Sequence, residues 1–290
     1  FCHINDLPEW VHSDVRMFAD DCLLYRTIRT EEDHVAIQRD LHALEKWASM
    51  WGMSFNATKC YVMRVCRKKN PSDWIYTLGD TPLEKVETNP YLGLLLSKDL
   101  KPSKHIQKVG KKANNMLSFL RRNLRSCPKS LKETAYTSLV RSVTEYASAV
   151  WDPYLDKDKQ YLEKIQRRAA RFVTHNYKDY TPGSMTNILK QLNWPTLESR
   201  RREMRLILFY KIVNGMIAIP KDDYILRNHN TTRSRNTLRF NRFSPIPKTD
   251  IAKYSFFPNT IIDWNNLEDE FVTAPNIEKF KSKLTTPQHD

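Results

Sequence analysis

The sequence predicts an α+β protein in which a small antiparallel sheet with one helix is followed by a mainly α-helical remainder. Up to about residue 100, short runs of aliphatic and aromatic residues alternate with turn residues, which is typical of strands. Beyond that point, apolar residues recur every three or four positions, which is the period of a helix face. The 290 residues are 40% hydrophobic and 28% charged, a globular composition with enough chain for two packed units.

The front part begins with a predicted hairpin. Residues 15–19 and 22–26 are expected to form two short strands, joined by a tight turn at Asp20 and Asp21. Further strands are expected at 59–65, 74–78 and 91–96. We expect these strands to share one small sheet.

A helix is predicted directly after the hairpin. Thr30 with Asp33 three residues later resembles a capping box, with Asp in place of the usual Glu. Gly52 marks the expected end of the helix. Apolar residues recur between these points at helical spacing, at Ile37, Leu41, Leu44, Ala48 and Trp51.

Four further helices are predicted after residue 100. The first runs from Ile106 to Leu124, the third covers about 158–174, and the fourth follows Trp194 and stops at Gly215. The second covers about 130–151, with an apolar stripe at Leu131, Ala135, Leu139, Val143, Tyr146 and Val150. From about residue 220 the chain carries prolines, asparagines and short apolar pieces that indicate no definite element.

The net charge of +14 raises the odds of a polyanionic partner over an unspecialised basic surface. From Lys101 to Lys132 there are ten positive residues and no acid. Most of them avoid the apolar stripe of the predicted helix, so they form a solvent-facing basic surface. If a nucleic-acid duplex binds this surface, its affinity should fall as the salt concentration rises. The slope of log affinity against log salt would be about −0.9 for each phosphate contacted. The alternative is an ordinary solvated face, although such faces normally mix both signs of charge.

Three later basic clusters leave two interpretations open. The first two clusters either bind template RNA or are merely solvated. The first consists of Lys164, Arg167, Arg168 and Arg171, and the second of Arg200, Arg201, Arg202 and Arg205. The third lies in the acid-free stretch 227–248, where Arg239 and Arg242 alternate with Phe240 and Phe243. Those rings either stack on single-stranded bases or lie in a core.

The stretch "RMFADDCLLY" (16–25) places two adjacent acids inside an apolar run. An unpaired buried carboxylate costs several kcal/mol, whereas a divalent metal bound at the turn would compensate for the two charges. Carboxylates are the hard oxygen ligands that Mg²⁺ and Mn²⁺ prefer. On its own, an Asp-Asp pair is more often a solvated turn.

Cellular context follows from cysteines and hydropathy. Five cysteines without paired spacing indicate neither a disulfide framework nor a zinc site, and favour a reducing, intracellular compartment. We expect no membrane span and no secretory leader, because no apolar run approaches about eighteen residues. The start at Phe1 instead of methionine suggests a fragment. His105 and His175 have no partners at metal-ligand spacing and are expected to be structural.

Seven segments together resemble the reverse transcriptases of non-LTR retrotransposons, and the later ones resemble the jockey-like branch. "FADD" (18–21) is similar to the Asp-Asp hairpin of the polymerase palm. "INDLP" (4–8) resembles the segment before that hairpin. The remaining segments come after it in the family's order, namely "WASMWGMSFNATKC" (47–60), "YLGLLLSKDLKPSKHI" (91–106), "YASAVWDP" (146–153), "LEKIQRRAARFV" (162–173) and "FFPNTIIDWNNL" (256–267). The resemblance implies a partial palm at 1–100, a basic helical thumb at 101–150 and a helical C-terminal region of unknown role at 151–290.

The resemblance also implies roles for residues. Asp20 is expected to ligate Mg²⁺ or Mn²⁺, with Asp21 as its supporting neighbour at the metal. Lys59 matches a lysine proposed to protonate pyrophosphate, unless it is an ordinary surface lysine at a strand start. Phe18 would pack beneath the nucleotides, and Tyr91, Leu92 and Gly93 would hold the primer end, although Gly93 could simply permit a bend. The duplex contacts would come from Lys104, Lys108, Lys111, Lys112, Arg121, Arg122 and Arg125.

One catalytic element of a palm is missing from this sequence. A polymerase needs a further aspartate on a neighbouring strand, and here only Asp6 and Asp14 precede the hairpin. Without a third carboxylate the two-metal geometry cannot be completed. We therefore expect a fragment of an RNA-directed DNA polymerase that binds an RNA template, a DNA primer and deoxynucleotides only within a longer protein, in the nucleus or cytoplasm, and is inactive alone. The alternatives are a non-catalytic nucleic-acid-binding module and a structural relic.

Overall fold

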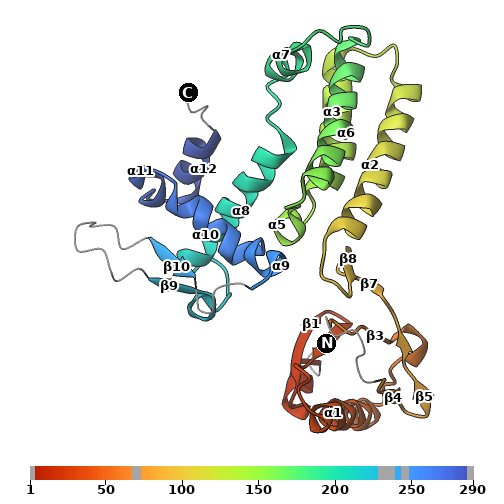
Figure 1. Ribbon diagram of the computed structural model, residues 1–290. Helices are drawn as coiled ribbons and strands as arrows, with labels where there is room; N and C mark the ends of the chain where they lie inside the picture. Colours follow the sequence, from red (N-terminus) through yellow and green to blue (C-terminus); the bar gives the residue numbers. More distant parts are fainter. Residues whose placement is uncertain (1–3, 67–72, 228–238, 243–247, 286–290) are drawn as a thin grey trace. The chain divides into compact units, whose positions relative to one another are not determined.

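The computed structural model describes residues 4–66, 73–227, 239–242 and 248–285 (Figure 1). The chain divides into two compact units, Phe1–Leu100 and Lys101–Asp290, which we call the N-terminal and C-terminal units. Each unit has its own core and is described by itself.

The N-terminal unit contains one long helix and a series of short strands. It opens with a 3₁₀-helix at Ile4–Trp10, and a second 3₁₀-helix spans Ala57–Lys59. The long helix is α1, Glu31–Met50. The strands are β1 Asp14–Phe18, β2 Asp21–Tyr25, β3 Tyr61–Val62, β4 Thr77–Leu78, β5 Thr81–Pro82, β6 Glu84–Lys85, β7 Thr88–Tyr91 and β8 Leu94–Ser97.

The predicted single sheet is wrong for the described residues. The strands pair two by two, as β1–β2, β4–β5 and β7–β8 in antiparallel hairpins and as β3–β6 in a parallel pair. The predicted strand 59–65 shortens to two residues, because Ala57–Lys59 takes a 3₁₀ turn that Asn56 caps with its side chain. The predicted strand 74–78 likewise keeps only Thr77–Leu78.

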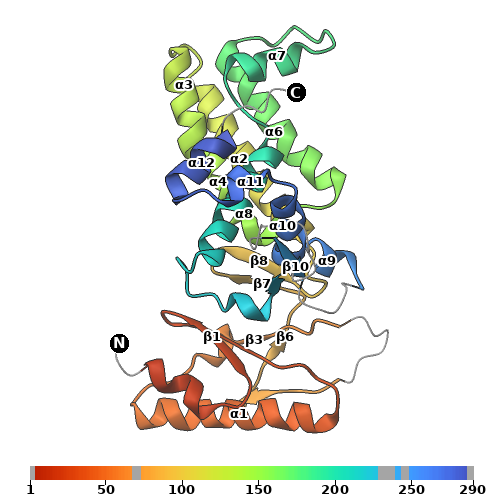
Figure 2. The same cartoon turned by 90° about the vertical axis from the view of Figure 1, so that its left-hand side faces the viewer.

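Helix α1 is the scaffold of this unit, and its start confirms the predicted capping box. The amides of Arg29 and Thr30 donate to the Asp33 carboxylate at 2.8 and 3.1 Å, which lowers the pKa of Asp33 to about 2. Beyond Trp51 the chain turns at Gly52, whose φ of 65° is one that glycine adopts readily. Figure 2 shows α1 running along one side of the β1–β2 hairpin.

Two apolar clusters attach strands to α1. Leu44, Trp47 and Ala48 pack with Leu7, and the hairpin adds Val15, Met17 and Leu24 to this cluster. Further along the chain, Ile37 and Leu41 pack against a second cluster formed by Tyr76, Leu78 and Leu83. Burial of each such side chain contributes about 1.5–3 kcal/mol, so the hairpin depends on α1 for its position.

The C-terminal unit is mainly α-helical. None of the helices in its described part, or in that of the N-terminal unit, is long and apolar enough to cross a membrane. Its helices are α2 Ser103–Asn123, α3 Lys129–Tyr136, a π-helix Thr137–Arg141, α4 Ser142–Glu145, α5 Ser148–Trp151, α6 Asp156–Thr174, α7 Ser184–Gln191, α8 Leu197–Val213, a 3₁₀-helix Lys221–Asp223, α9 Asp250–Lys253, α10 Phe256–Asn265, α11 Asp269–Val272 and α12 Ile277–Thr285, and its strands are β9 Ile225–Arg227 and β10 Phe240–Arg242.

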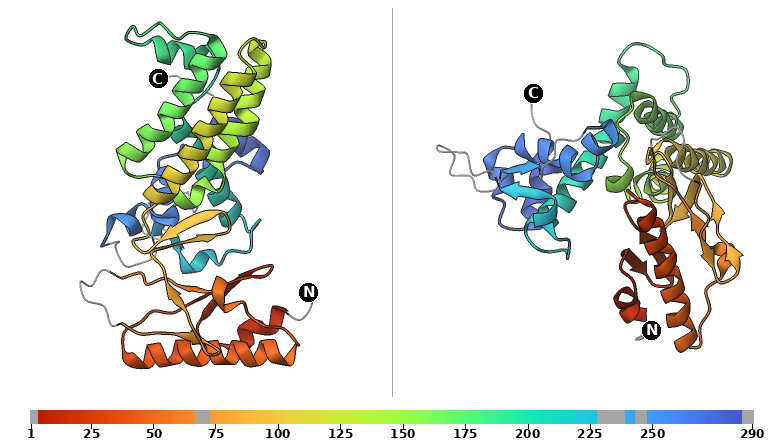
Figure 3. Two further views of the ribbon diagram at one scale, coloured as in Figure 1. Left: turned by 90° about the vertical axis from the view of Figure 1, so that its right-hand side faces the viewer. Right: turned by 60° about the horizontal axis from the view of Figure 1, so that its bottom comes forward.

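Helices α2 and α6 run parallel and in close contact (Figure 3). Ser103 Oγ donates to Asp158 at 2.5 Å near one end, and Arg168 donates to Asn114 at 3.1 Å farther along. Both pairs have nearly the same separation in sequence, 55 and 54 residues, as parallel helices require. Gly110 lies at the crossing, where an added Cβ would overlap the ring of Tyr161. The absence of a side chain at Gly110 therefore sets how closely the helices approach.

The predicted helix 130–151 is wrong in its continuity and in its buried face. A π-helical turn adds residues between α3 and α4, and Ala147 with a φ of 50° separates α4 from α5. The apolar stripe predicted at a 3.6-residue period already lies one position off the buried face at Leu131, before the π-helical turn. Four of its members are exposed, Leu131, Leu139, Tyr146 and Val150, and the buried positions are Lys132, Tyr136, Val140, Thr144, Ser148 and Trp151.

The stretch beyond residue 220, for which the sequence indicated no element, completes a second core around α8. Phe209 and Tyr210 of α8 pack on Trp264 of α10 and Phe280 of α12. The Tyr210 hydroxyl donates to the backbone oxygen of Ala274 at 2.8 Å, so its polar group is satisfied inside this core.

We expect Gly110→Ala to destabilise the chain although alanine favours a helix by about 1 kcal/mol over glycine. The new methyl group would displace the Tyr161 ring, whose Cζ lies 2.7 Å from the added Cβ, and overpacking of this kind costs about 1–3 kcal/mol. In a Tyr161→Ala background the same substitution should instead stabilise. Urea unfolding of the four variants measures both signs; destabilisation in both backgrounds would contradict the proposed contact.

Candidate nucleic-acid and metal site

The β1–β2 hairpin places the two aspartates at its tip. Phe18 pairs with Asp21 and Met17 with Cys22, so the two-residue turn consists of Ala19 and Asp20. The predicted turn at Asp20 and Asp21 is therefore wrong by one residue, because Asp21 belongs to β2. Ala19 takes the positive φ of 52° that lets the two strands reverse direction tightly.

Both carboxylates are exposed, as a turn between two strands allows. The apolar residues on either side reach the core through alternate strand positions, Val15, Met17 and Leu24. Phe18 is also 64% exposed next to the acids. The aspartates thus carry no large desolvation cost, and their oxygens are open to a cation.

A second hairpin lies near the first. Strands β7 and β8 are joined by Leu92 and Gly93, whose φ values of 47° and 83° make this a turn with two left-handed residues. The half-buried Tyr91 precedes the turn; burial raises the pKa of Tyr91, and the nearby charge of Asp21 raises it further. The predicted primer residue Tyr91 and the predicted metal residue Asp21 are therefore close in space. The positive φ of Gly93 favours glycine at this turn, in agreement with the alternative that Gly93 simply permits a bend.

Lys59 lies at the end of the 3₁₀-helix Ala57–Lys59 and is exposed, instead of starting a strand. Its neighbour Cys60 lies near Cys22 of β2. Burial raises the pKa of the Cys22 thiol, and the nearby Cys60 raises it further. The loop that carries Lys59 therefore lies beside the hairpin. The structure records no contact of Lys59 itself with either aspartate.

Neither earlier aspartate completes a metal site. Asp6 accepts a hydrogen bond from Trp47 Nε1 at 2.9 Å and so fixes the 3₁₀-helix to α1. Asp14 pairs with Tyr25 at the far end of the hairpin, about 13 Å along the strand from Phe18. Within the described ranges, no group of three or more His, Cys, Asp or Glu residues could hold a metal. Asp20 and Asp21 offer the oxygen ligands that Mg²⁺ and Mn²⁺ prefer, and they fit part of such a ligand set.

Asp40 is a positioning residue that our sequence reasoning missed. Its carboxylate is buried in α1 and accepts hydrogen bonds from the amides of His12 and Ser13 at 3.0 and 2.9 Å. These amides lead into β1, so Asp40 fixes where the hairpin begins. The available signal was an acid on the apolar face of the helix, three residues after Ile37 and four before Leu44.

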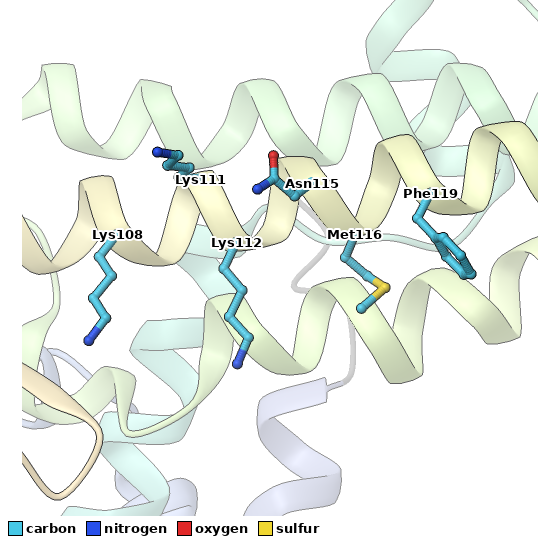
Figure 4. A pocket seen from close by; sticks show the side chains of 6 residues that line it. All are labelled: Lys108, Lys111, Lys112, Asn115, Met116 and Phe119. Atoms are coloured by element: carbon cyan, nitrogen blue, oxygen red, sulfur yellow. The ribbon is translucent and has the colours of Figure 1, made fainter.

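The C-terminal unit carries the predicted basic surface on α2. Its buried face consists of His105, Ile106, Val109, Gly110, Ala113, Leu117 and Leu120. All seven predicted nucleic-acid contacts are exposed, Lys104, Lys108, Lys111, Lys112, Arg121, Arg122 and Arg125. Among the described residues, Lys108, Lys111, Lys112, Arg122 and Arg125 form no ion pair. Figure 4 shows Lys108 and Lys112 pointing to the same side of α2 as Met116 and Phe119, along an open groove.

The second arginine cluster is structural, so the expectation that it binds RNA or is merely solvated is wrong for its buried members. On α8, Arg201 bonds Asp152 at 2.8 Å, and Arg205 bonds both Asp152 and Asp263 at 2.8 Å. The outer pair is also engaged, Arg200 with Glu145 and Arg202 with Asp263. On α6, by contrast, Lys164, Arg167 and Arg168 are exposed, and the bond from Arg168 to Asn114 joins that surface to α2.

The third cluster lies partly outside the described residues. Phe240 is buried against Phe209 and Trp264, and Arg239 donates to the backbone oxygens of Trp264 and Leu267. The core interpretation, which concerned the aromatic rings, is therefore correct for Phe240. Phe243 and the side chain of Arg242 lie outside what the structure describes.

Lys132 corrects the predicted basic surface. It is the last of the ten cations between residues 101 and 132, and it lies on the buried face of α3. Its ammonium contacts His175 Nε2 and lies 5.3 Å from the ring centre of Phe172. His105 is buried against Trp151, and burial lowers its pKa. Both histidines thus take part in the packing of the helices.

We expect Asp21→Asn to lower the pKa of Tyr91, because a nearby negative charge disfavours the phenolate. The pKa should remain above the ordinary tyrosine value, since burial is the larger cause. Alkaline titration by ¹³C-tyrosine NMR, with Tyr91→Phe to assign the signal, measures the shift. Asp14→Asn at the other end of the hairpin is the control and should have no effect; an unchanged Tyr91 pKa in Asp21→Asn would contradict the proximity.

Comparison with known proteins gives one similarity. No family model matches the chain, and no solved structure matches it. Among curated proteins, the chain is similar to the probable RNA-directed DNA polymerase from transposon X-element of Drosophila melanogaster, with 25% identity over 180 residues. The match covers 59% of this chain and 20% of that polymerase, so the chain spans about a fifth of its relative. The likeness supports a reverse-transcriptase-like region of a retrotransposon in this chain.

Proposed function

We propose that the chain is part of an RNA-directed DNA polymerase of a jockey-like retrotransposon, and that α2 holds the duplex of RNA template and DNA primer. Residues 1–100 would be the end of the palm, 101–150 the thumb and 151–290 a helical C-terminal region. The observation that carries this proposal is the exposed face of α2, on which four cations lack an acidic partner among the described residues, with Arg125 as a fifth just after the helix. The similarity to the X-element polymerase and the Asp-Asp hairpin support it.

In the whole enzyme, Asp20 would ligate Mg²⁺ or Mn²⁺ and Asp21 would support it. Such a metal supplies Lewis-acid stabilisation of phosphate oxygens. Phe18 and Tyr91 line the same region as the aspartates, which suits contacts to the primer end, with Leu92 and Gly93 forming the turn beside it. Lys59 would stabilise negative charge that develops on pyrophosphate, since its loop lies next to β2.

The chain alone would bind nucleic acid without extending a primer. Two carboxylates are an incomplete ligand set, and the earlier acids Asp6 and Asp14 are engaged elsewhere or distant. The basic surface of α2, by contrast, needs no further residue to contact phosphates. This difference also favours the second candidate, a nucleic-acid-binding module without catalysis. A structural relic would lack the duplex binding that both candidates share.

We expect neutralisation of Lys108, Lys111 and Lys112 to glutamine to weaken duplex binding and to flatten its salt dependence. If each lysine contacts one phosphate, the slope of log affinity against log salt should fall by about 2.7, at about 0.9 per contact. Fluorescence anisotropy with a labelled RNA–DNA duplex at several salt concentrations measures the slope.

The matched control removes three exposed lysines of the same unit outside α2 and α6, Lys190, Lys253 and Lys279. It has the same net charge and should keep most of the slope. Equal slopes for the two triple variants would contradict a specific duplex surface on α2 and would leave only a general attraction by net charge.

A further inference from the structure

Two exposed tyrosines lie on the loop between α6 and α7, and neither is used in the proposed duplex contact. Tyr180 is 76% exposed and Tyr177 is 40% exposed. The loop leaves α6 after Thr174 and enters α7 at Ser184, at the end of the bundle to which the C-terminus of α2 also extends (Figure 1). Exposed aromatic rings are costly to leave in water, so two on one short loop call for an explanation.

Each ring is backed by an arginine. The guanidinium carbon of Arg171 lies 4.5 Å from the ring centre of Tyr180, and that of Arg121 lies 5.8 Å from the ring centre of Tyr177. A guanidinium on one face of a tyrosine holds the ring in place through a cation–π contact. The high exposure of Tyr180 means that most of its remaining surface stays accessible.

The loop is also held in shape by hydrogen bonds. Arg171 Nη1 donates to the backbone oxygens of Asn176 and Asp179 at 3.0 and 2.8 Å. Asp179 Oδ1 in turn accepts from the amide and the hydroxyl of Thr181 at 3.0 and 2.6 Å. Because Arg171 both fixes the loop and backs Tyr180, the ring is ordered before any ligand arrives, which reduces the entropy cost of binding.

The charge around the rings is positive. Arg121 of α2 and Arg171 of α6 lie over the rings, and Lys178 lies between the two tyrosines in sequence. Between Thr174 and Ser184, Asp179 is the only acid, and its carboxylate is occupied by Thr181. Phosphates of a nucleic acid would therefore meet cations beside the rings.

We propose that Tyr177 and Tyr180 form a stacking surface for the bases of a single strand that continues beyond the duplex bound on α2. A ring face can stack on a base only where that base is not already stacked inside a duplex, so this surface selects single strands. Aromatic stacking accepts any base, and the cations accept both RNA and DNA. This proposal rests on the proposed function and adds a second class of contact to it.

The test compares variants of the full 290-residue chain by anisotropy with three labelled probes: a twelve-nucleotide single-stranded RNA, the DNA of the same sequence and their blunt duplex. Base–aromatic stacking contributes about 1–3 kcal/mol per base, so Tyr180→Leu should weaken binding of a single strand at least about fivefold. Binding of the blunt duplex should be unchanged. Tyr180→Trp should retain single-strand affinity, because a larger ring preserves stacking.

Tyr146→Leu is the matched control, because Tyr146 is 60% exposed but lies on the α4–α5 segment of the bundle. Single-strand affinity should be unaffected in this variant. An RNA or DNA strand bound equally by the parent and Tyr180→Leu would overturn the proposal, as would an equal loss on single strand and duplex. A different result would contradict only the duplex surface. In that result, the lysine variants of α2 bind the duplex as the parent does, while Tyr180→Leu still weakens binding of a single strand.

Discussion

The C-terminal unit depends on the carboxylate of Asp152, which bonds both Arg201 and Arg205. Arg201 has no exposed surface, and an unpaired buried charge would cost several kcal/mol. Asp152 therefore fixes α8 to the end of α5, while Asp263 fixes the same helix to α10 through Arg205. Asp152, Asp263 and Glu145 are thus occupied by arginines of α8. On α2, by contrast, Lys108, Lys111, Lys112 and Arg122 form no ion pair within the described residues and remain available to phosphates.

In the N-terminal unit one helix, α1, positions the other elements through hydrogen bonds to carboxylates. Asp33 fixes the start of α1, the buried Asp40 fixes the entry into β1, and Trp47 fixes Asp6. Asp20 and Asp21 differ because both are exposed at the tip of a hairpin, with Tyr91 near Asp21.

Sequence patterns predicted the elements in which one local signal dominates. The capping box at Thr30 and the apolar stripes of α1, α2 and α6 have clear helical periods, and the structure contains these helices. The prediction of one helix over 130–151 failed because a π-turn and Ala147 interrupt it, and because contacts with His175 and Phe172, far away in sequence, bury Lys132. The pairing of two-residue strands, the role of Asp40 and the arginines behind Tyr177 and Tyr180 likewise depend on contacts that no local pattern reveals.

If a template–primer duplex lies on α2, it should shield the lysines of that helix from chemical modification. Lysine acetylation of the full chain, followed by mass spectrometry with and without an RNA–DNA duplex, measures this shielding. We expect slower acetylation of Lys108, Lys111 and Lys112 when the duplex is present, with Lys253 and Lys279 unchanged. Equal protection at all five lysines, or protection confined to the last two, would contradict duplex binding on α2.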